Sequence, residues 1–562
     1  MKVVKSIVKF ISNNSIWLLI IVYVYVRSFY WNCPPVWDGM AYFSGLLNAT
    51  RATFDILNYC VDGHLTQAFL LIMGLPFKLF KQDFYLFNVW LTLFGIISLV
   101  AFYNLASFFF KNYLSKIELV LVTTLFAFHP SVLSSMINFN IDIGVLTFFM
   151  LYWLYLLRRK RMIATAFAFL LAFSKETSML LIILPFLFCL LFETSSVSTP
   201  WLSELSKYFY SSSKEKVKVL VPLPVVFHLL VKQFSERIIW IKKHIVILIV
   251  PYFSLVIFIS YKVFIRHQPA FWTNLSDSNM TTILNYFSGD GRMINYLGLI
   301  FVINFNWILS IILIALIALS IIYRKTIKNK NQLKPAVLLL LLFIFLVFIL
   351  TLVRSWSDVR YLTIIIPITI LCIIQILSLF SFPRLARLSV IVLLLILFSW
   401  ENIRTVDPLS KALFGTFNFG NHEMLYISKR TNETPGSYGR DELVYKLEFL
   451  KIRQLLNKIF EDIQPNSQTC FISNGDASWM TLTTMDDNYK MAIVGEHLFS
   501  PLFLLKEDIL KPNRLPADVY LLDYPNSDNT DESTLLNGQY SKSEVKVYDI
   551  DGYQMKVVHY KK

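Results

Sequence analysis

Residues 84–110 read FYLFNVWLTLFGIISLVAFYNLASFFF, a run without a single charged side chain. An α-helix needs about 20 apolar residues to cross the roughly 30 Å hydrocarbon core of a bilayer. Inside that core an isolated segment satisfies its own backbone hydrogen bonds only as a helix. Comparable apolar runs, separated by short charged connectors, recur up to residue 400. The chain is therefore expected to be an α-helical membrane protein with many spans.

Composition agrees, because 56% of the 562 residues are hydrophobic and 16% are charged, which excludes a water-soluble globule. We expect about eleven transmembrane helices. The expected spans are 14–31, 84–110, 117–130, 143–157, 162–174, 176–192, 245–264, 296–322, 335–353, 360–382 and 387–400. The apolar segment 64–80 is short and contains Gly74 and Pro76. We interpret it as an interfacial helix lying among the lipid headgroups.

Lysine and arginine concentrate in alternate connectors of this scheme. The basic connectors are 2–9, 111–116, 158–161, 193–244, 324–334 and 384–387. With a cytoplasmic N-terminus, all of them fall on the cytoplasmic side, as the positive-inside rule requires. This placement also explains the net charge of +15 without nucleic acid as a partner. We expect a multi-pass protein of a bacterial inner membrane or of the endoplasmic reticulum membrane.

Composition changes near residue 400, where the sequence begins to resemble an ordinary soluble domain. We therefore divide the chain into a transmembrane domain, 1–400, and a small periplasmic or lumenal α/β domain, 401–562. The expected elements of the second domain are a helix at 441–462, strands at 469–474 and 518–524, and a hairpin at 544–561 around an Asp-Gly turn. This domain could bind an acceptor or act as a structural cap.

The first outer connector contains Asp38 and Tyr42, which are four residues apart and would share one face of a helix. Asp38 follows the first expected span by a few residues, so it lies close to the membrane surface. Spacing alone favours a helix N-cap for Asp38, because a helix-forming stretch follows it. A catalytic carboxylate is the alternative.

Further ionisable residues are expected on the same side, namely His64, Asp142, Lys175, Glu176 and Arg360. Asp142 opens an apolar helix and could be its cap. Lys175 and Glu176 separate two apolar runs, where charged groups face a polar cavity or form an ion pair. Arg360 begins a helix at the interface and could extend to the headgroups. Together these residues fit a site where an anionic lipid headgroup reacts with a nucleophile.

In their order along the chain, these motifs resemble the GT-C class of integral-membrane glycosyltransferases, in particular the branch of protein O-mannosyltransferases and lipid A aminoarabinose transferases. The resemblance covers residues 14–193, with a looser continuation at 354–367. The motifs that carry it are Asp38-Gly39-Met40-Ala41-Tyr42, Gly63-His64, Pro130, Asp142, the basic turn Arg158–Arg161, Ser174-Lys175-Glu176-Thr177, and Arg360-Tyr361 followed by Pro367. The ordered series is more specific than any of its members.

The resemblance implies an enzyme that moves a hexose or pentose from undecaprenyl or dolichyl phosphate to a lipid, glycan or protein acceptor at the outer face. An acceptor hydroxyl attacks C1 of the sugar with inversion, and a carboxylate takes its proton. Asp38 is the implied base. The leaving phosphate gains negative charge, which cations stabilise. The implied phosphate ligands are Lys175, Arg360 and His64, and the remaining implied site residues are Tyr42, Asp142, Glu176 and Tyr361.

The sequence departs from the family pattern at Gly39, which stands where a second acid is usual. That departure argues against a two-carboxylate metal site. The sequence identifies no cofactor, and a divalent cation is left open. Cys33 and Cys60 share the first outer connector, in a compartment that permits oxidation, so a disulfide between them is a further hypothesis.

Two other functional classes fit an apolar bundle. A transporter or flippase for a lipid or solute usually shows inverted repeats and polar groups at the membrane midplane. The sequence shows no clear repeat, and its polar residues gather toward one face. A membrane scaffold without catalysis is the third class, and the Gly39 departure favours it. We expect the glycosyltransferase, with the transporter as the alternative.

Overall fold

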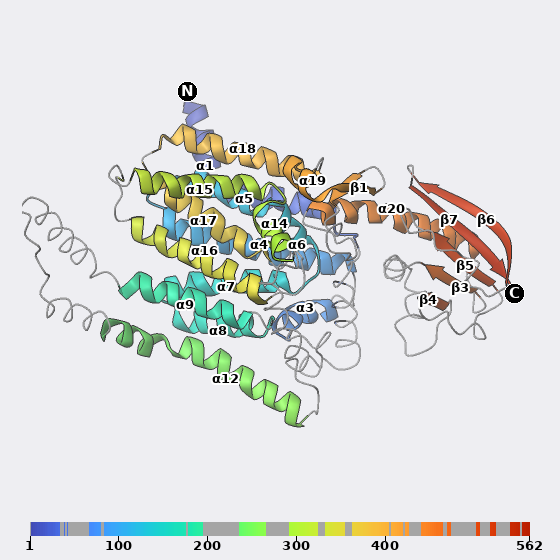
Figure 1. Cartoon of the computed structure of the whole chain (residues 1–562), viewed down its shortest axis with the longest axis horizontal. Coiled ribbons are helices and arrows are strands. Elements are labelled where there is room, and N and C mark those ends of the chain that lie inside the picture. Colours follow the sequence, from blue (N-terminus) through green and yellow to red (C-terminus); the bar gives the residue numbers. More distant parts are fainter. Residues whose placement is uncertain are drawn as a thin grey trace, which may run out of the picture.

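The structure of the 562-residue chain is a computed structural model. The residues it describes are 2–33, 39, 42, 46, 67–79, 84–175, 178–194, 235–265, 292–323, 327, 332–353, 362–380, 382–403, 406–419, 422–425, 440–464, 469–473, 502–505, 518–523, 540–550 and 553–562. Most of them form a helical bundle, and a smaller part with β-strands lies beyond one end of it (Figure 1).

The helices of the bundle run back and forth along its length (Figure 1). They are α1 (Lys2–Ser28), α3 (Gln67–Leu79), α4 (Phe84–Phe110), α5 (Lys116–Ala127), α6 (Pro130–Ile137), α7 (Asp142–Leu157), α8 (Arg161–Ala172), α9 (Ser178–Thr194), α12 (Val246–Ser260) with the π-helical turn η2 (Tyr261–Ile265), α14 (Arg292–Phe301), α15 (Asn306–Ile322), α16 (Leu333–Val353), α17 (Ile365–Leu377) and α18 (Arg384–Ile403). Their facing side chains form one continuous apolar core.

Close packing holds such a bundle together, because lipid tails are as apolar as the helices themselves. Small residues at contacts let helices approach. A Cβ atom on Gly144 of α7 would lie 2.7 Å from the ring of Phe69 on α3, which is closer than atoms pack. Gly144 therefore allows the short helix α3 to lie directly against the start of α7.

Four helical segments are long and apolar enough to cross a bilayer, namely Tyr85–Phe110, Val246–Ile265, Leu333–Leu350 and Arg384–Ile403, and the bent pair α5 and α6 gives up to five. The other apolar helices among the described residues have 10–17 residues, fewer than the about 20 of a full crossing. The chain is an integral membrane protein, whereas the expected count of about eleven spans is not confirmed.

Two of the expected spans are interrupted. The run 117–130 stops at Ala127, and the chain bends by 65° before α6 starts at Pro130. The run 296–322 is divided into α14 and α15, because Asn304 and Phe305 adopt left-handed conformations with φ of 56° and 59°. Such residues cannot continue a right-handed helix. Hydropathy did not reveal these breaks, since the residues around them are largely apolar.

Several basic connectors meet at the end of the bundle that lies away from the β-strands (Figure 1). Arg159 Nε lies 3.2 Å from Glu193 Oε2, so the connector after α7 contacts the end of α9. Lys334, at the start of α16, donates a hydrogen bond to the backbone oxygen of Phe192, which is also on α9. This grouping agrees with the expected placement of these connectors on one side, and the orientation of that side stays a prediction.

Glu118 joins α5 to α18 at the same end. Its side chain is 1% exposed, and its Oε1 accepts hydrogen bonds from Nε and Nη2 of Arg387 at 3.2 and 2.9 Å. Its Oε2 accepts from the backbone N and Oγ of Ser115, which completes a capping box at the start of α5. Arg384, whose side chain is 58% exposed, lies farther away at 3.8 Å.

We expect Glu118→Gln to destabilise the protein by about 3 kcal/mol, because it leaves the Arg387 guanidinium largely buried without its counter-charge. Arg384→Gln is the matched control and should change stability by about 1 kcal/mol or less, since exposed pairs contribute little. The measurement is the thermal unfolding midpoint of both variants in detergent. Equal midpoints for the two variants would contradict the assignment of Glu118 as the main anchor.

Beyond α18 the chain forms α19 (Pro408–Phe414), β1 (Thr416–Phe419), β2 (His422–Leu425), α20 (Arg440–Ile463), β3 (Thr469–Ser473), β4 (Leu502–Leu505), β5 (Asp518–Asp523), β6 (Ser541–Ile550) and β7 (Tyr553–Lys561). β1 and β2 are antiparallel, and the five-stranded sheet has the order β4-β3-β5-β7-β6. The expected helix at 441–462, the strands at 469–474 and 518–524, and the terminal hairpin are confirmed. The division into two domains at residue 400 stays a prediction.

Helix α20 covers part of this sheet. Tyr548 and Lys546 of β6 donate hydrogen bonds to Asp462 near the end of α20, at 2.5 and 3.1 Å. Both hydrogen bonds lower the pKa of the Asp462 carboxyl below its usual value, and the bond from Tyr548 has the larger effect. The other end of α20 contacts α6 and α18, so one helix connects the sheet to the bundle.

Candidate functional site

The described residues that were expected to form a site lie at the end of the bundle nearest to the β-strands. That end holds α3, α6, the starts of α7 and α15, and the turn between α8 and α9 (Figure 1). Helix α6 is the short limb that follows the 65° bend after α5. In a membrane protein, helix ends within a bundle occur where polar groups line a cavity or are buried in protein.

Asp142 and Lys175 form a buried ion pair at this end. Lys175 Nζ lies 2.7 Å from Asp142 Oδ1, and each residue is 6% exposed. Asp142 is the first residue of α7, and Lys175 lies in the turn that follows α8. Removing two charges from water is costly, so such a pair adds little stability. In membrane proteins, buried ionisable residues of this kind mark functional sites.

The turn that carries Lys175 is held by hydrogen bonds of the two residues that precede it. Ser174 Oγ donates to the backbone oxygen of Leu170 at 2.6 Å, which closes the last turn of α8. The backbone oxygen of Phe173 accepts from the backbone N of Ala68 at 3.0 Å, so α3 begins directly on this turn. The Lys175 side chain therefore starts from a fixed point of the backbone.

The start of α7 decides between the interpretations of Asp142. Ile141 occupies the N-cap position, where no side chain caps the helix. Asn140 Oδ1 instead accepts a hydrogen bond from the backbone N of Asp142 at 3.1 Å. The cap interpretation is therefore wrong, and the interhelical ion pair weighed for Lys175 is confirmed, with Asp142 as its described partner.

Lys262 is a buried cation that the sequence analysis missed. It lies in η2, the π-helical turn after α12, and is 7% exposed. Its Nζ atom has no hydrogen-bond partner in the described part of the chain. Its cation–π contact is the ring of Phe258, 5.7 Å away. π-helical turns inside α-helices often occur at functional sites.

The helix that precedes Lys262 packs against the turn that carries Lys175. The ring of Phe258 on α12 packs edge-on against Phe173, with 5.5 Å between ring centroids, and Phe173 is two residues before Lys175. The opposite face of this helix is open, since Phe253 and Phe264 are 63% and 75% exposed. Helix α12 lies at the edge of the bundle (Figure 1). One helix therefore presents apolar side chains to lipid and a buried ammonium to the protein interior.

A third buried cation, Arg27, anchors the segment that leads to Asp38. Arg27 is 2% exposed, and its Nη1 donates to the backbone oxygen of Met136 at the end of α6. Its Nε donates to Thr92 Oγ1 at 3.3 Å, and Trp31 Nε1 donates to the same oxygen at 2.9 Å. Asn88 Nδ2 donates to the backbone oxygen of Trp31 at 2.8 Å. This network fixes the chain a few residues before Asp38.

The remaining expected site residues fall into two groups. Tyr42 is buried at 6% exposure and helical, as is Gly39. Six residues lie outside the described part of the chain, namely Asp38, His64, Glu176, Arg360, Tyr361 and Cys60. Their roles, and the disulfide between Cys60 and the buried Cys33, stay predictions. In the part of the chain that is described, no three His, Cys, Asp or Glu side chains are grouped as metal ligands.

No protein-family model matches the sequence, and no curated protein matches it either. Two solved structures are similar in fold. The first is ArnT from Cupriavidus metallidurans in the apo state, with a TM-score of 0.47 and 10% identity over 96% of this chain and 97% of that chain. The second is ArnT from the same organism bound to undecaprenyl phosphate, with a TM-score of 0.44 and 12% identity over 96% and 98%.

ArnT is a lipid A aminoarabinose transferase. At this level of similarity, the function of this chain has to be inferred from its own residues.

Proposed function

We propose that this protein transfers a sugar from a polyprenyl-phosphate donor to an acceptor hydroxyl at the outer face of the membrane. The supporting observation is the buried ammonium of Lys262, which has no hydrogen-bond partner in the described part of the chain, on a helix that packs against the turn of the buried pair Asp142 and Lys175. A buried cation is costly unless an anion compensates it. An anion carried by a lipid meets this requirement at that position.

The proposed reaction is an inverting displacement. The acceptor oxygen bonds to C1 of the sugar while the bond from C1 to the phosphate oxygen breaks. Asp38 takes the hydroxyl proton as general base. The electron pair of the broken bond stays on the phosphate, which leaves as polyprenyl phosphate with an additional negative charge.

The cations stabilise that additional charge more strongly in the transition state than in the bound donor, which is how they accelerate the reaction. Lys262 and Lys175 are the described candidates, and Arg360 and His64 are expected to join them. Asp142 is a positioning residue, because it holds the Lys175 ammonium in place. Tyr42, Glu176 and Tyr361 would line the same site.

The finer architecture belongs to the same proposal. About eleven spans would place the N-terminus in the cytoplasm and the candidate site at the outer leaflet. Residues 401–562 would then form an α/β domain on the periplasmic or lumenal side. The basic connectors at the opposite end of the bundle support this orientation.

The experiment that tests the proposal is Asp38→Asn in proteoliposomes supplied with a radiolabelled polyprenyl-phosphate sugar. The amide keeps the shape of the side chain but cannot accept the proton, so kcat should fall by about 10²- to 10⁴-fold. Donor binding should change little. Asp549→Asn, on the exposed strand β6, is the matched control and should transfer sugar at the wild-type rate.

Full activity of Asp38→Asn would remove Asp38 as the base. If the wild-type protein transfers none of several polyprenyl-phosphate sugars, the transferase proposal fails. Donor-independent movement of a lipid between leaflets by that protein would then indicate the transporter.

A further inference from the structure

A crevice opens toward lipid between α15 and α18, which lie next to each other at the side of the bundle (Figure 1). Helix α18 packs against α5, and α15 packs against α17, so these two pairs of helices form its walls. Leu309 of α15, Ile370 of α17 and Ile391 of α18 are among its apolar lining residues. The outer faces of both rims are also apolar, since Ile314 of α15 and Leu393 of α18 are 67% and 57% exposed. The crevice therefore faces the hydrocarbon of the membrane.

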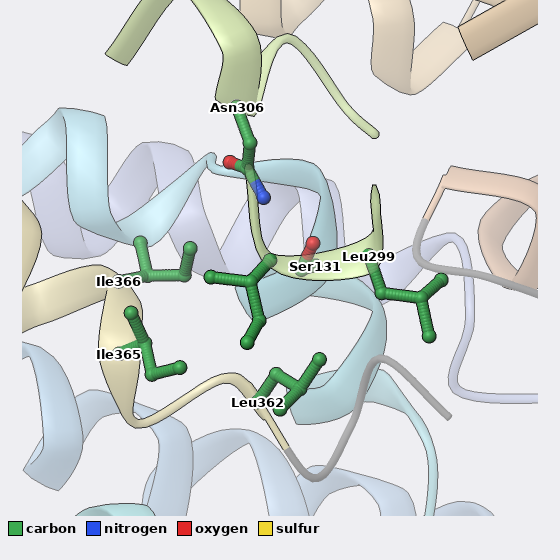
Figure 2. Close-up of a pocket in the computed structure, with 7 residues that line it drawn as sticks. Ser131, Leu299, Asn306, Leu362, Ile365 and Ile366 are labelled. Atoms are coloured by element: carbon green, nitrogen blue, oxygen red, sulfur yellow. The ribbon is translucent and has the colours of Figure 1, made fainter. Parts of the chain in front are cut away.

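The depth of the crevice corresponds to part of one leaflet. Its lining extends along α18 from Arg387 to Leu394, a rise of about 10 Å at about 1.5 Å per residue. One leaflet contributes about 15 Å of hydrocarbon. Farther along α15 and α17, Figure 2 shows a separate small pocket beside Asn306 and Ile366, which has room for about one water molecule. An acyl chain in the crevice would therefore belong to the leaflet at the end of the bundle where the basic connectors meet.

Arg387 and Tyr113 form the mouth of the crevice at that end. The Arg387 guanidinium lies over the Tyr113 ring, 4.5 Å from its centroid, and Tyr113 Oη donates to the backbone oxygen of Leu377 at 3.0 Å. Glu118 accepts two hydrogen bonds from Arg387, so the charge of this arginine is compensated within the protein. Arg387 therefore shapes the mouth, and other cations are needed to hold an anionic ligand there.

Three exposed cations surround this mouth, namely Lys111, Lys116 and Arg384. Arg384 Nη2 donates to Ser115 Oγ at 3.3 Å, which holds it against the connector that carries both lysines. Together with Arg387 and Glu118 they give four cations and one carboxylate, a formal charge of +3. Positive charge therefore gathers where an apolar crevice reaches the membrane surface.

We propose that this crevice binds an anionic phospholipid. Its phosphate would lie between Arg384 and the lysines of the connector, and one acyl chain would lie along α17 and α18 below Arg387. Basic sites between transmembrane helices bind anionic headgroups in this way. The inference requires only that the chain spans a membrane, so it does not depend on the proposed transfer reaction.

The charge and the position of the site together select this ligand. A zwitterionic lipid brings an ammonium group of its own, which the cluster of cations repels. An acidic protein could reach the exposed cations but could not fill a crevice that opens within the hydrocarbon. A phospholipid with a net negative charge satisfies the cations and covers the apolar lining at the same time.

The test is a titration of the full-length protein in detergent with dioleoyl phosphatidylglycerol, followed by native mass spectrometry. The wild-type protein should bind this lipid about fivefold or more tightly than dioleoyl phosphatidylcholine, since each lysine or arginine beside a headgroup contributes about fivefold in affinity. Arg384→Gln should therefore weaken binding about fivefold, and Lys111→Gln/Lys116→Gln about 25-fold.

Val390→Phe tests the crevice separately, because Val390 lines it and the larger ring would occupy the path of the acyl chain. This variant should weaken binding although every cation is kept. Lys242→Gln/Lys243→Gln is the matched control, since it removes two exposed charges from another basic connector and should leave binding unchanged. Thermal midpoints check that each variant folds, and the cation variants remain informative if Val390→Phe does not fold.

Equal affinities of the wild-type protein for the two lipids overturn the proposal. An equal loss of affinity in the two double-lysine variants also overturns it, because binding would then reflect only the overall charge of that surface. Unchanged binding by a folded Val390→Phe protein rejects the crevice as the place of the acyl chain. Glycerophosphoglycerol, the headgroup without chains, should not displace the lipid, and displacement would show that a free phosphate ester suffices.

Discussion

Lys262→Met is expected to lose most sugar transfer while the protein becomes more stable. Methionine fills the same space without a charge, so it removes a buried ammonium that has no described hydrogen-bond partner. Unfolding should then cost about 1–3 kcal/mol more. If the ammonium stabilises the leaving phosphate, kcat should fall by about 10²- to 10³-fold, as for other single groups of this kind.

These two opposite effects distinguish a functional lysine from a structural one. They are measured as the thermal unfolding midpoint and the rate of transfer in the same preparation. Lys243→Met, at an exposed position near the other end of the helical segment that includes α12, is the matched control and should change neither. A Lys262→Met protein with a lower midpoint and normal transfer would mean that Lys262 serves only to hold the fold.

The ion pair of Asp142 and Lys175 should show non-additive effects on stability and no rescue of transfer. Asp142→Asn and Lys175→Met each leave one buried charge without its partner, which should cost about 3–5 kcal/mol. The double variant removes both charges and should recover most of that loss, as a double-mutant cycle reveals. At low donor concentration, transfer should stay low in all three proteins, because each lacks a correctly held Lys175 ammonium.

The dependence of the transfer rate on donor concentration distinguishes a residue that positions Lys175 from one that binds the donor itself. Asp142→Asn keeps the lysine, so high donor concentrations should restore part of its transfer rate, whereas Lys175→Met should not respond. Recovery of transfer together with stability in the double variant would show that the pair is purely structural. That result would remove Lys175 from the site and leave Lys262 as the described phosphate ligand.

The sequence predicted the helical class and the grouping of charges better than the individual helices. An apolar run indicates burial in lipid or protein, and its mean hydropathy is an average over many residues. The break between α14 and α15 depends on the backbone conformations of Asn304 and Phe305, which no average shows. The strands at 469–474 and 518–524 were predicted because alternating or β-branched residues between turn signals are locally distinctive.

The site was predicted less completely. Asp142 and Lys175 were found because charges are conspicuous between apolar runs, but their pairing depends on how α7 and α8 fold against each other. Lys262 is the one charged residue of the run 245–264, so the sequence could have identified it as a candidate site residue. The hydrogen bonds of His129 with Asn306 and of Asn304 with Ser131 at the same end of the bundle could not be predicted, since each joins side chains more than 170 residues apart in the sequence.

The open apolar face of α12 has a kinetic consequence. A donor that meets Lys262 would arrive sideways through the leaflet, so the relevant quantity is its mole fraction among lipids, not its concentration in water. Diluting the vesicles with buffer should then leave the initial rate per enzyme unchanged. Diluting the donor with inert phospholipid should lower that rate in proportion, as for enzymes whose substrates stay within the membrane.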